Sequence, residues 1–330
     1  MNRKRLWMTL VGVACLVLAA VPALLFRGMT LRQTDQQAAA FWRADSEVRF
    51  AQVSCFLDGD AGFQVNDVMR VRQSVSDALA SQTDAAWTAG YSAQTTVSVV
   101  KEKTTVSARA ICTGGDFFLF HPLELVSGCY YNEEEVNKDS VLLDMNLAWK
   151  LYGGYDLQGM SLTVNGLPVT IAGVVRAPAA SPEREAYGET PTIWLSLGLM
   201  DKLGQTPNLT CYEAVLPNPV KSFAQSTLKT ALSLPESSLE LLENTGRFGF
   251  LTSLKNVWNP AARTMRTSRV IYPYWENAAR LVESRSTLYA VLTAVLLLYP
   301  VIYILYLVIS LLVKTDRRVR GWIHRKRSFR

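Results

Sequence analysis

The chain has 330 residues, of which 49% are hydrophobic, and its formal net charge is +6. The basic residues gather at the two ends: residues 1–5 and 314–330 hold 11 of the 34 Lys and Arg residues and 1 of the 28 acids. The rest of the chain therefore carries 23 basic and 27 acidic residues, a balance of −4. The overall basicity is thus no evidence for a nucleic-acid partner, and the basic ends are typical of segments that contact anionic lipid.

Two apolar runs without a charge, Leu6–Phe26 and Ser286–Val313, stand next to these basic ends. A helix needs about 20 apolar residues to cross the hydrocarbon layer, so both runs are predicted transmembrane helices. The first run has an alternative, a cleavable signal peptide. That alternative is disfavoured because the apolar part of a signal is usually about 7–15 residues long, and no A-x-A site closely follows the run.

The positive charges before the first run and after the second predict that both ends of the chain are cytoplasmic. We therefore expect a cell-membrane protein (plasma or inner membrane) whose central part is extracytoplasmic. The predicted division is a cytoplasmic start (1–5), a span (6–26), an extracytoplasmic domain with helical stalks (27–285), a second span (286–313) and a basic tail (314–330).

The first part of the extracytoplasmic segment predicts a stalk, a strand, a helix and a hairpin. The stalk continues the first span over Thr30–Ser46, and alternating apolar residues predict a strand over Glu47–Leu57. Asn66 is the expected cap of a helix that ends near Leu79. Two β-branched runs, Thr95–Val100 and Thr104–Ala110, indicate a hairpin or one broken strand.

The middle part is dense in short elements. An aromatic piece over Asp116–Phe120 leads into a turn over His121–Gly128 and a capped turn over Asn132–Val136. A strand over Ser140–Leu143 and a helix over Asp144–Tyr152 follow, and the helix is expected to end at Gly153-Gly154. Asn165-Gly166 then joins the strands Ser161–Val164 and Pro168–Val175. This dipeptide accepts the positive φ angles of a type I′ turn, so the sequence predicts a β-hairpin.

The last part mixes strands and helices. A loop over Pro178–Pro191 precedes the predicted strands Thr192–Leu195 and Tyr212–Leu216 and the predicted helices Met200–Leu203, Ser222–Leu234, Glu236–Asn244 and Arg247–Glu283. Trp258 and the Tyr272–Trp275 cluster fit either a membrane-interface belt or an ordinary core. The fold class predicted for the domain is α+β, in two subdomains, between two transmembrane helices.

The residues from Asp116 to Val175 resemble the periplasmic core domain of MacB-like ABC transporter permeases, the MacB/FtsX superfamily. The resemblance holds in order and spacing over about 60 residues, at Asp116–Phe118, Leu123–Tyr131, Val141–Asp144, Ala148–Gly154, Asp156–Gly159, Leu162–Gly166 and Thr170–Val175. Permeases of this family look like four-span proteins, so this chain resembles a two-span, half-length form.

The resemblance implies a non-catalytic membrane subunit whose ectodomain couples ATP-driven motion to export or to mechanotransmission. The chain has no Gly-x-x-x-x-Gly-Lys-Ser/Thr, so the ATPase is expected on a separate chain. A companion permease or a second copy of this chain is expected beside it, with membrane lipid as a further partner. The alternative is a membrane-anchored extracellular sensor or binding protein without a transport role.

Little in the sequence favours catalysis, and no cofactor or metal site is predicted. His121 is interpreted as a loop hydrogen-bonder, and the acids Glu133–Glu135 as the start of a helix. Four cysteines permit two disulfides, with a local Cys112–Cys129 bridge preferred and Cys55–Cys211 as the remainder; the alternative is that they are free, buried thiols. Pro300 predicts a kink in the second span, and Tyr299, Tyr303 and Tyr306 face either another helix or lipid.

Overall fold

The computed structural model describes residues 3–43, 47–80, 86–131, 139–179, 181–266 and 270–327. The turn predicted over Asn132–Val136, with its three glutamates, lies outside these residues. The chain forms two compact units. The membrane-helix unit comprises Met1–Arg32, Phe248–Asn259 and Glu283–Arg330, and the folded domain comprises Gln33–Arg247 and Pro260–Val282.

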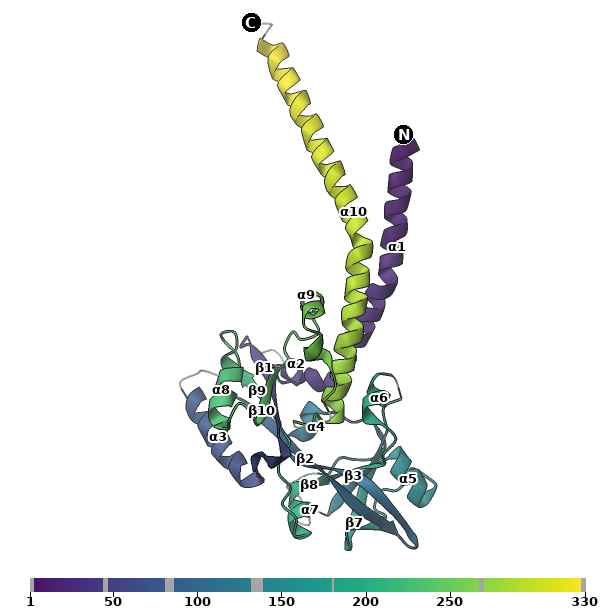
Figure 1. The fold of residues 1–330 in the computed structure, drawn as a ribbon, viewed down its shortest axis with the longest axis vertical. Coiled ribbons are helices and arrows are strands. Elements are labelled where there is room, and N and C mark those ends of the chain that lie inside the picture. The colour runs from purple at the N-terminus through teal and green to yellow at the C-terminus, as the bar shows by residue number, and fades with distance from the viewer. Residues whose placement is uncertain are drawn as a thin grey trace. The chain divides into compact units, whose positions relative to one another are not determined.

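The membrane-helix unit contains the two predicted spans as long helices (Figure 1). Helix α1 covers Arg3–Leu31, and α10 covers Tyr274–Arg327, of which the part from Glu283 belongs to this unit. Both are long and apolar enough to cross a membrane. A short helix α9 (Phe250–Lys255) and a 3-10 turn η3 (Asn256–Trp258) complete the unit.

The two long helices pack together at Gly12. A Cβ placed on Gly12 would lie 3.8 Å from the rings of both Tyr299 and Tyr303, an ordinary van der Waals contact, so these rings leave room there for a small residue only. The Tyr303 hydroxyl lies 3.0 Å from Thr9 Oγ1, and the Tyr299 hydroxyl donates to the Met8 carbonyl over 3.2 Å. Two of the three tyrosines therefore face the neighbouring helix.

The folded domain is built on one sheet with ten described strands. Nine of them follow each other in the order β10 (Leu239–Glu243), β1 (Phe50–Leu57), β9 (Cys211–Pro217), β2 (Thr88–Lys101), β3 (Thr104–Gly115), β8 (Thr192–Ser196), β5 (Ser140–Asp144), β7 (Leu167–Val175) and β4 (Leu125–Gly128). The tenth, β6 (Ser161–Val164), pairs with β7 and with the far end of β2. The long β2–β3 hairpin thus joins the two halves that the sequence suggests as subdomains.

Helices cover both faces of this sheet, because its strands bury alternate side chains on opposite sides. The first face packs against α3 (Val65–Leu79), α5 (Met145–Tyr152), α7 (Leu197–Lys202) and α8 (Phe223–Leu232). The second face packs against α2 (Ala38–Arg43), α4 (Phe117–Phe120), α6 (Glu183–Tyr187) and the first turns of α10. The segments that continue into the two membrane helices therefore lie on the second face.

Local sequence determines several of these elements. Asn165 and Gly166 have φ of 45° and 92° and connect β6 to β7, with Val164 paired to Leu167. Asp144 caps α5 through a 2.7 Å hydrogen bond from the Leu147 amide, and Gly153 ends the helix with φ of 67°.

Tertiary pairing overrides local preference elsewhere. The helix predicted over Glu236–Asn244 is wrong: Leu239–Glu243 is β10, which pairs antiparallel with β1. Leu and Glu favour helices, but this run completes the edge of the sheet beside a buried strand. The turn expected over His121–Gly128 likewise contains β4, which pairs with β7.

Three boundaries also differ from the prediction. Gln64, not Asn66, caps α3, through a capping box with Asp67. The predicted stalk is not one helix, since α1 ends at Leu31 and is followed by the 3-10 turn η1 (Thr34–Gln36) and α2. The segment 247–283 holds α9, η3, a second 3-10 turn η4 (Pro260–Arg263) and the start of α10 rather than one helix.

Candidate functional site

The second face of the sheet contains a buried ion pair between His121 and Glu213. His121 follows α4 and Glu213 lies in the central strand β9; only 1% and 3% of their surfaces are exposed. His121 Nε2 contacts Glu213 Oε2 directly. His121 Nδ1 lies 3.4 Å from Asp35 Oδ1 of η1, an ion-pair distance rather than a well-aligned hydrogen bond. The imidazole therefore bridges β9 and the segment that follows the first membrane helix.

The pKa values of both groups favour the charged pair. Burial alone lowers the pKa of His121, but the charges of Glu213 and Asp35 outweigh it and raise the pKa to about 9. Burial raises the pKa of Glu213, but the His121 charge and hydrogen bonds from His121, Ser54 and Gln52 lower it overall. His121 is thus an imidazolium at neutral pH, and Glu213 is its carboxylate partner.

Aromatic rings surround the imidazolium. The Trp275 ring, in the first turn of α10, lies 4.2 Å from the His121 ring between centroids, and the Phe117 ring lies 4.8 Å away. A cation next to the π-face of Trp is stabilised electrostatically, more strongly when water is excluded. His121 therefore contacts η1, β9 and α10 at once.

Polar side chains continue from Glu213 across two strands. Ser54 of β1 lies opposite Glu213 in the strand register and donates a hydrogen bond to it. Asn244, just after β10, donates to Ser54 Oγ over 2.8 Å. All three side chains are buried, which means that each hydrogen bond satisfies a group that water does not reach.

The network ends on the first turns of α10. Arg247 donates to Asn244 over 3.2 Å and forms two 2.8 Å hydrogen bonds to the Glu276 carboxylate. Arg280, one turn further along α10, donates to Glu276 over 2.6 Å. Arg247, Glu276 and Arg280 are 6% exposed or less. Paired arginine and carboxylate groups at such depth are strongly held, since removing one partner leaves an uncompensated buried charge.

Gln52 holds the segment that follows the first membrane helix, namely η1 and α2. Its side-chain carbonyl accepts from the Ala38 amide over 2.9 Å, and its amide nitrogen donates to the Asp35 carbonyl over 2.7 Å. Gln52 is fully buried in β1. The backbone of η1 and α2 is therefore bound to the same strand that carries Ser54, so one polar network holds both segments that continue into the membrane helices.

The arrangement of Ser54, Glu213 and His121 is not suited to nucleophilic catalysis. In a serine triad the base contacts the nucleophile, whereas here the Glu213 carboxylate lies between Ser54 and His121. The imidazolium is already protonated at neutral pH, and the group is closed to substrate. Among the described residues there is also no cluster of three or more His, Cys, Asp or Glu side chains that could hold a metal ion.

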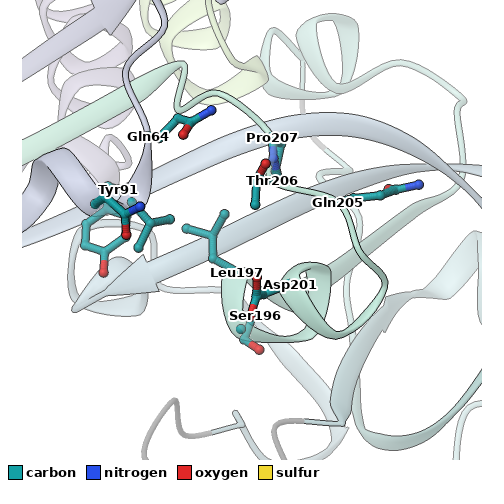
Figure 2. Close-up of a pocket in the computed structure, with 11 residues that line it drawn as sticks. Gln64, Tyr91, Ser196, Leu197, Asp201, Gln205, Thr206 and Pro207 are labelled. Carbon is teal, nitrogen blue, oxygen red and sulfur yellow. The ribbon is translucent and has the colours of Figure 1, made fainter.

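One pocket of about 350 Å³ opens on the folded domain, between the start of α3 and α7 (Figure 2). Its lining mixes polar and apolar groups, and the polar side chains include Gln64, Tyr91, Ser196, Asp201 and Gln205. The Tyr91 ring stacks on the buried ring of Tyr212, with centroids 6.2 Å apart. The pocket shares no residue with the buried polar network.

The cysteines are free thiols in the structure, so the bridges preferred from the sequence are not present among the described residues. Cys55 pairs with Tyr212 and Cys211 with Phe56, which places the two thiols on opposite faces of the sheet. Cys112 is buried in the first-face core, whereas Cys129 is exposed after β4. Burial raises the pKa of the Cys55 and Cys211 thiols and brings that of Cys112 to about 12.

Some of the aromatic residues near the second span lie in the core of the folded domain, and one is exposed as expected for a membrane interface. Tyr272 and Trp275 are buried in the second-face core, while Trp258 is 88% exposed in the membrane-helix unit. Pro300 lies inside α10, where it cannot donate to the Leu296 carbonyl, and the kink stays a prediction.

The sequence did not reveal the polar network. Its members are separated by up to 245 positions, from Asp35 to Arg280, so no local spacing brings them together. One signal was available: Glu213 stands alone in the otherwise apolar strand around Tyr212–Leu216, and a charge in a buried strand needs a partner. For His121 the sequence predicts a hydrogen-bonding role, but not a charged one.

A mixed α/β domain between two helices that are long and apolar enough to cross a membrane defines the class as a membrane-anchored domain. The sequence profile of the family described as "MacB-like periplasmic core domain" matches residues 6–225, two-thirds of the chain. The chain belongs to this family, as the sequence resemblance indicates. No match is found among curated proteins.

Solved structures of the same kind are similar at low identity. The periplasmic region of MacB from Actinobacillus actinomycetemcomitans is 13% identical with a TM-score of 0.45, over 63% of this chain and 92% of that one. The extracellular domain of the noncanonic ABC-type transporter YknZ from Gram-positive bacteria is 12% identical with a TM-score of 0.43, over 58% and 99%. A domain of a putative permease from Porphyromonas gingivalis is 16% identical with a TM-score of 0.35, over 59% and 89%.

Proposed function

We propose that this chain is a non-catalytic membrane subunit of a MacB/FtsX-type ABC transporter complex. Its ectodomain couples ATP-driven motion to an extracytoplasmic event, either export or mechanotransmission. The ATPase is a separate chain, and a companion permease or a second copy of this chain completes the membrane part. Family membership supports this proposal, because domains of this family belong to ABC-transporter-type permeases.

The buried polar network is the observation that supports the coupling role. His121 contacts Asp35 of η1 and Trp275 of α10, which are the two elements through which the folded domain continues into its membrane helices. Force transmission requires such connections to be stiff, and a densely packed interior is stiff. A loosely attached linker would absorb motion instead.

Affinity purification of the full chain from its native membrane, in mild detergent, tests the assembly. We expect an ATPase chain with a phosphate-binding loop to co-purify in a fixed ratio. A suitable control is an unrelated two-span membrane protein with the same tag. Recovery of the chain without any ATPase, at detergent concentrations that preserve other ABC complexes, would contradict the proposal.

The topology is part of the same proposal, with both termini cytoplasmic and residues 27–285 outside. Cys129 is exposed in the folded domain, so it reports the side of the membrane on which this domain lies. A membrane-impermeant maleimide added to intact cells is expected to label Cys129, and Cys129→Ser is expected to remove the label. Labelling only after the membrane is opened would place the domain inside the cell.

A second candidate function is an extracellular binding protein without a transport role. The pocket in Figure 2 favours it, because about 350 Å³ with several polar groups suits a small polar ligand. The two candidates differ in what co-purifies: a binding protein would retain a small extracellular molecule and no ATPase. Asp201→Ala, at the pocket, would then weaken binding without affecting the buried polar network.

A further inference from the structure

Large apolar side chains are exposed on the short segment 248–259 of the membrane-helix unit. Leu251 of α9 is 72% exposed and Trp258 of η3 is 88% exposed. Ser253 of the same helix is buried, so α9 has one covered side and one exposed apolar side. An exposed Trp and an exposed Leu within one segment of twelve residues are unusual on a surface that contacts only water.

This segment lies at one end of the first span. The Phe250 ring meets the Phe26 ring edge-on, with centroids 5.7 Å apart. Phe26 is the last residue of the uncharged run Leu6–Phe26 and is followed by Arg27. The contact therefore places α9 at the boundary between the hydrocarbon layer and the lipid headgroups, within about one helical turn of Arg27.

The exposed side of α9 has the composition of an interfacial surface. Leu251 and Lys255 are four residues apart on the helix, so they point to the same side, and both are exposed. A lysine in this position buries its methylene stem among acyl chains and extends its ammonium to the phosphate layer. Tryptophan is enriched at this depth, because its ring is largely apolar and its N–H is polar.

We propose that residues 248–259 form a lipid-binding surface at the membrane interface. Trp258 and Leu251 lie among the upper acyl chains, and Lys255 contacts lipid phosphate. Lipid is the occupant because the surface is continuous with a membrane-spanning helix through the Phe26–Phe250 contact. The proposal does not depend on the ATPase or on the coupling role.

Fluorescence quenching in vesicles tests it. The full chain, with Cys15→Ala and Cys129→Ser, is given one new cysteine by Trp258→Cys or Leu251→Cys, labelled with an environment-sensitive maleimide dye and reconstituted in phosphatidylcholine–phosphatidylglycerol vesicles. Cys55, Cys112 and Cys211 are buried and stay unlabelled in the folded protein. Met69→Cys is the matched control, since Met69 is 71% exposed on α3 of the folded domain.

Lipid that carries a nitroxide near the headgroup is expected to quench the dye at positions 251 and 258 by about twofold or more, and aqueous iodide to quench it little. The dye at position 69 should show the reverse. Strong iodide quenching at 251 and 258, equal to that at 69, would overturn the proposal. Protection from both quenchers would also overturn it, because the surface would then be covered by protein.

Discussion

Glu213→Gln removes the charge that holds His121 protonated, and its effect follows from the pKa of that imidazole. A pKa of about 6.5 in the unfolded chain and about 9 in the folded domain corresponds to about 3 kcal/mol of stabilisation. Because the folded pKa is the higher one, this stabilisation is complete below about pH 6.5 and is lost as the pH rises through about 9. Without Glu213, burial dominates and lowers the His121 pKa again.

Thermal unfolding of the full chain in detergent, followed by circular dichroism from pH 6 to pH 10, measures this effect. We expect Glu213→Gln to lower the unfolding midpoint by roughly 6–12 °C near pH 6. We also expect the wild-type midpoint to fall above about pH 7, whereas that of the variant stays level over the same window.

The control is Glu236→Gln. The Glu236 carboxylate pairs with Lys229 at an exposed position, so the unfolding midpoint of this variant should not change measurably. A second variant, His121→Phe with Glu213→Met, should recover part of the loss, because replacing a whole buried pair by apolar groups costs less than removing one partner. If Glu213→Gln shifts the unfolding midpoint no more than Glu236→Gln does, and keeps the pH dependence of the wild type, then His121 and Glu213 are not a buried ionised pair.

Three further predictions concern other parts of the chain. Gly166→Ala should destabilise the folded domain by about 1 kcal/mol in chemical unfolding, because φ of 92° strains an L-residue, whereas Gly154→Ala, in open space, should change little. Gly12→Leu should lower the thermal unfolding midpoint of the full chain in detergent, since a larger side chain displaces the Tyr299 and Tyr303 rings, whereas Gly12→Ala, whose Cβ fits at 3.8 Å, should leave the midpoint unchanged. Thiol titration of the folded protein should modify Cys129 quickly, and unfolding without reductant should expose Cys55, Cys112 and Cys211; missing thiols after unfolding would indicate disulfides.

The sequence predicts well those elements whose cause is local. Uncharged runs define both spans, and Asn165-Gly166 defines the hairpin, because hydropathy and turn chemistry depend on neighbouring residues. The prediction fails at Leu239–Glu243, where the partner strand β1 precedes the segment by more than 180 residues and determines its conformation. Local preference for helix is a few tenths of a kcal/mol per residue, which strand pairing and burial exceed.

The candidate site is harder to predict, for a related reason. His121, Glu213 and Ser54 lie on three separate elements, and only the sheet order places β1 beside β9. The sequence also left the aromatic residues near the second span undecided, since a core and a membrane interface both favour Trp and Tyr. Burial separates them, with Trp275 inside the domain and Trp258 exposed in the membrane-helix unit.

The proposed coupling role requires the folded domain to move together with its membrane helices when ATP binds elsewhere in a complex. Nitroxides at Met69 of α3 and at Leu251 of α9, in the co-purified complex in vesicles, report the distance between the two units by double electron–electron resonance. We expect the distance distribution to stay narrow and in place when ATP is added, and Glu213→Gln to broaden it. A wild-type distribution that shifts or broadens with ATP, in a complex that hydrolyses ATP, would contradict the coupling role.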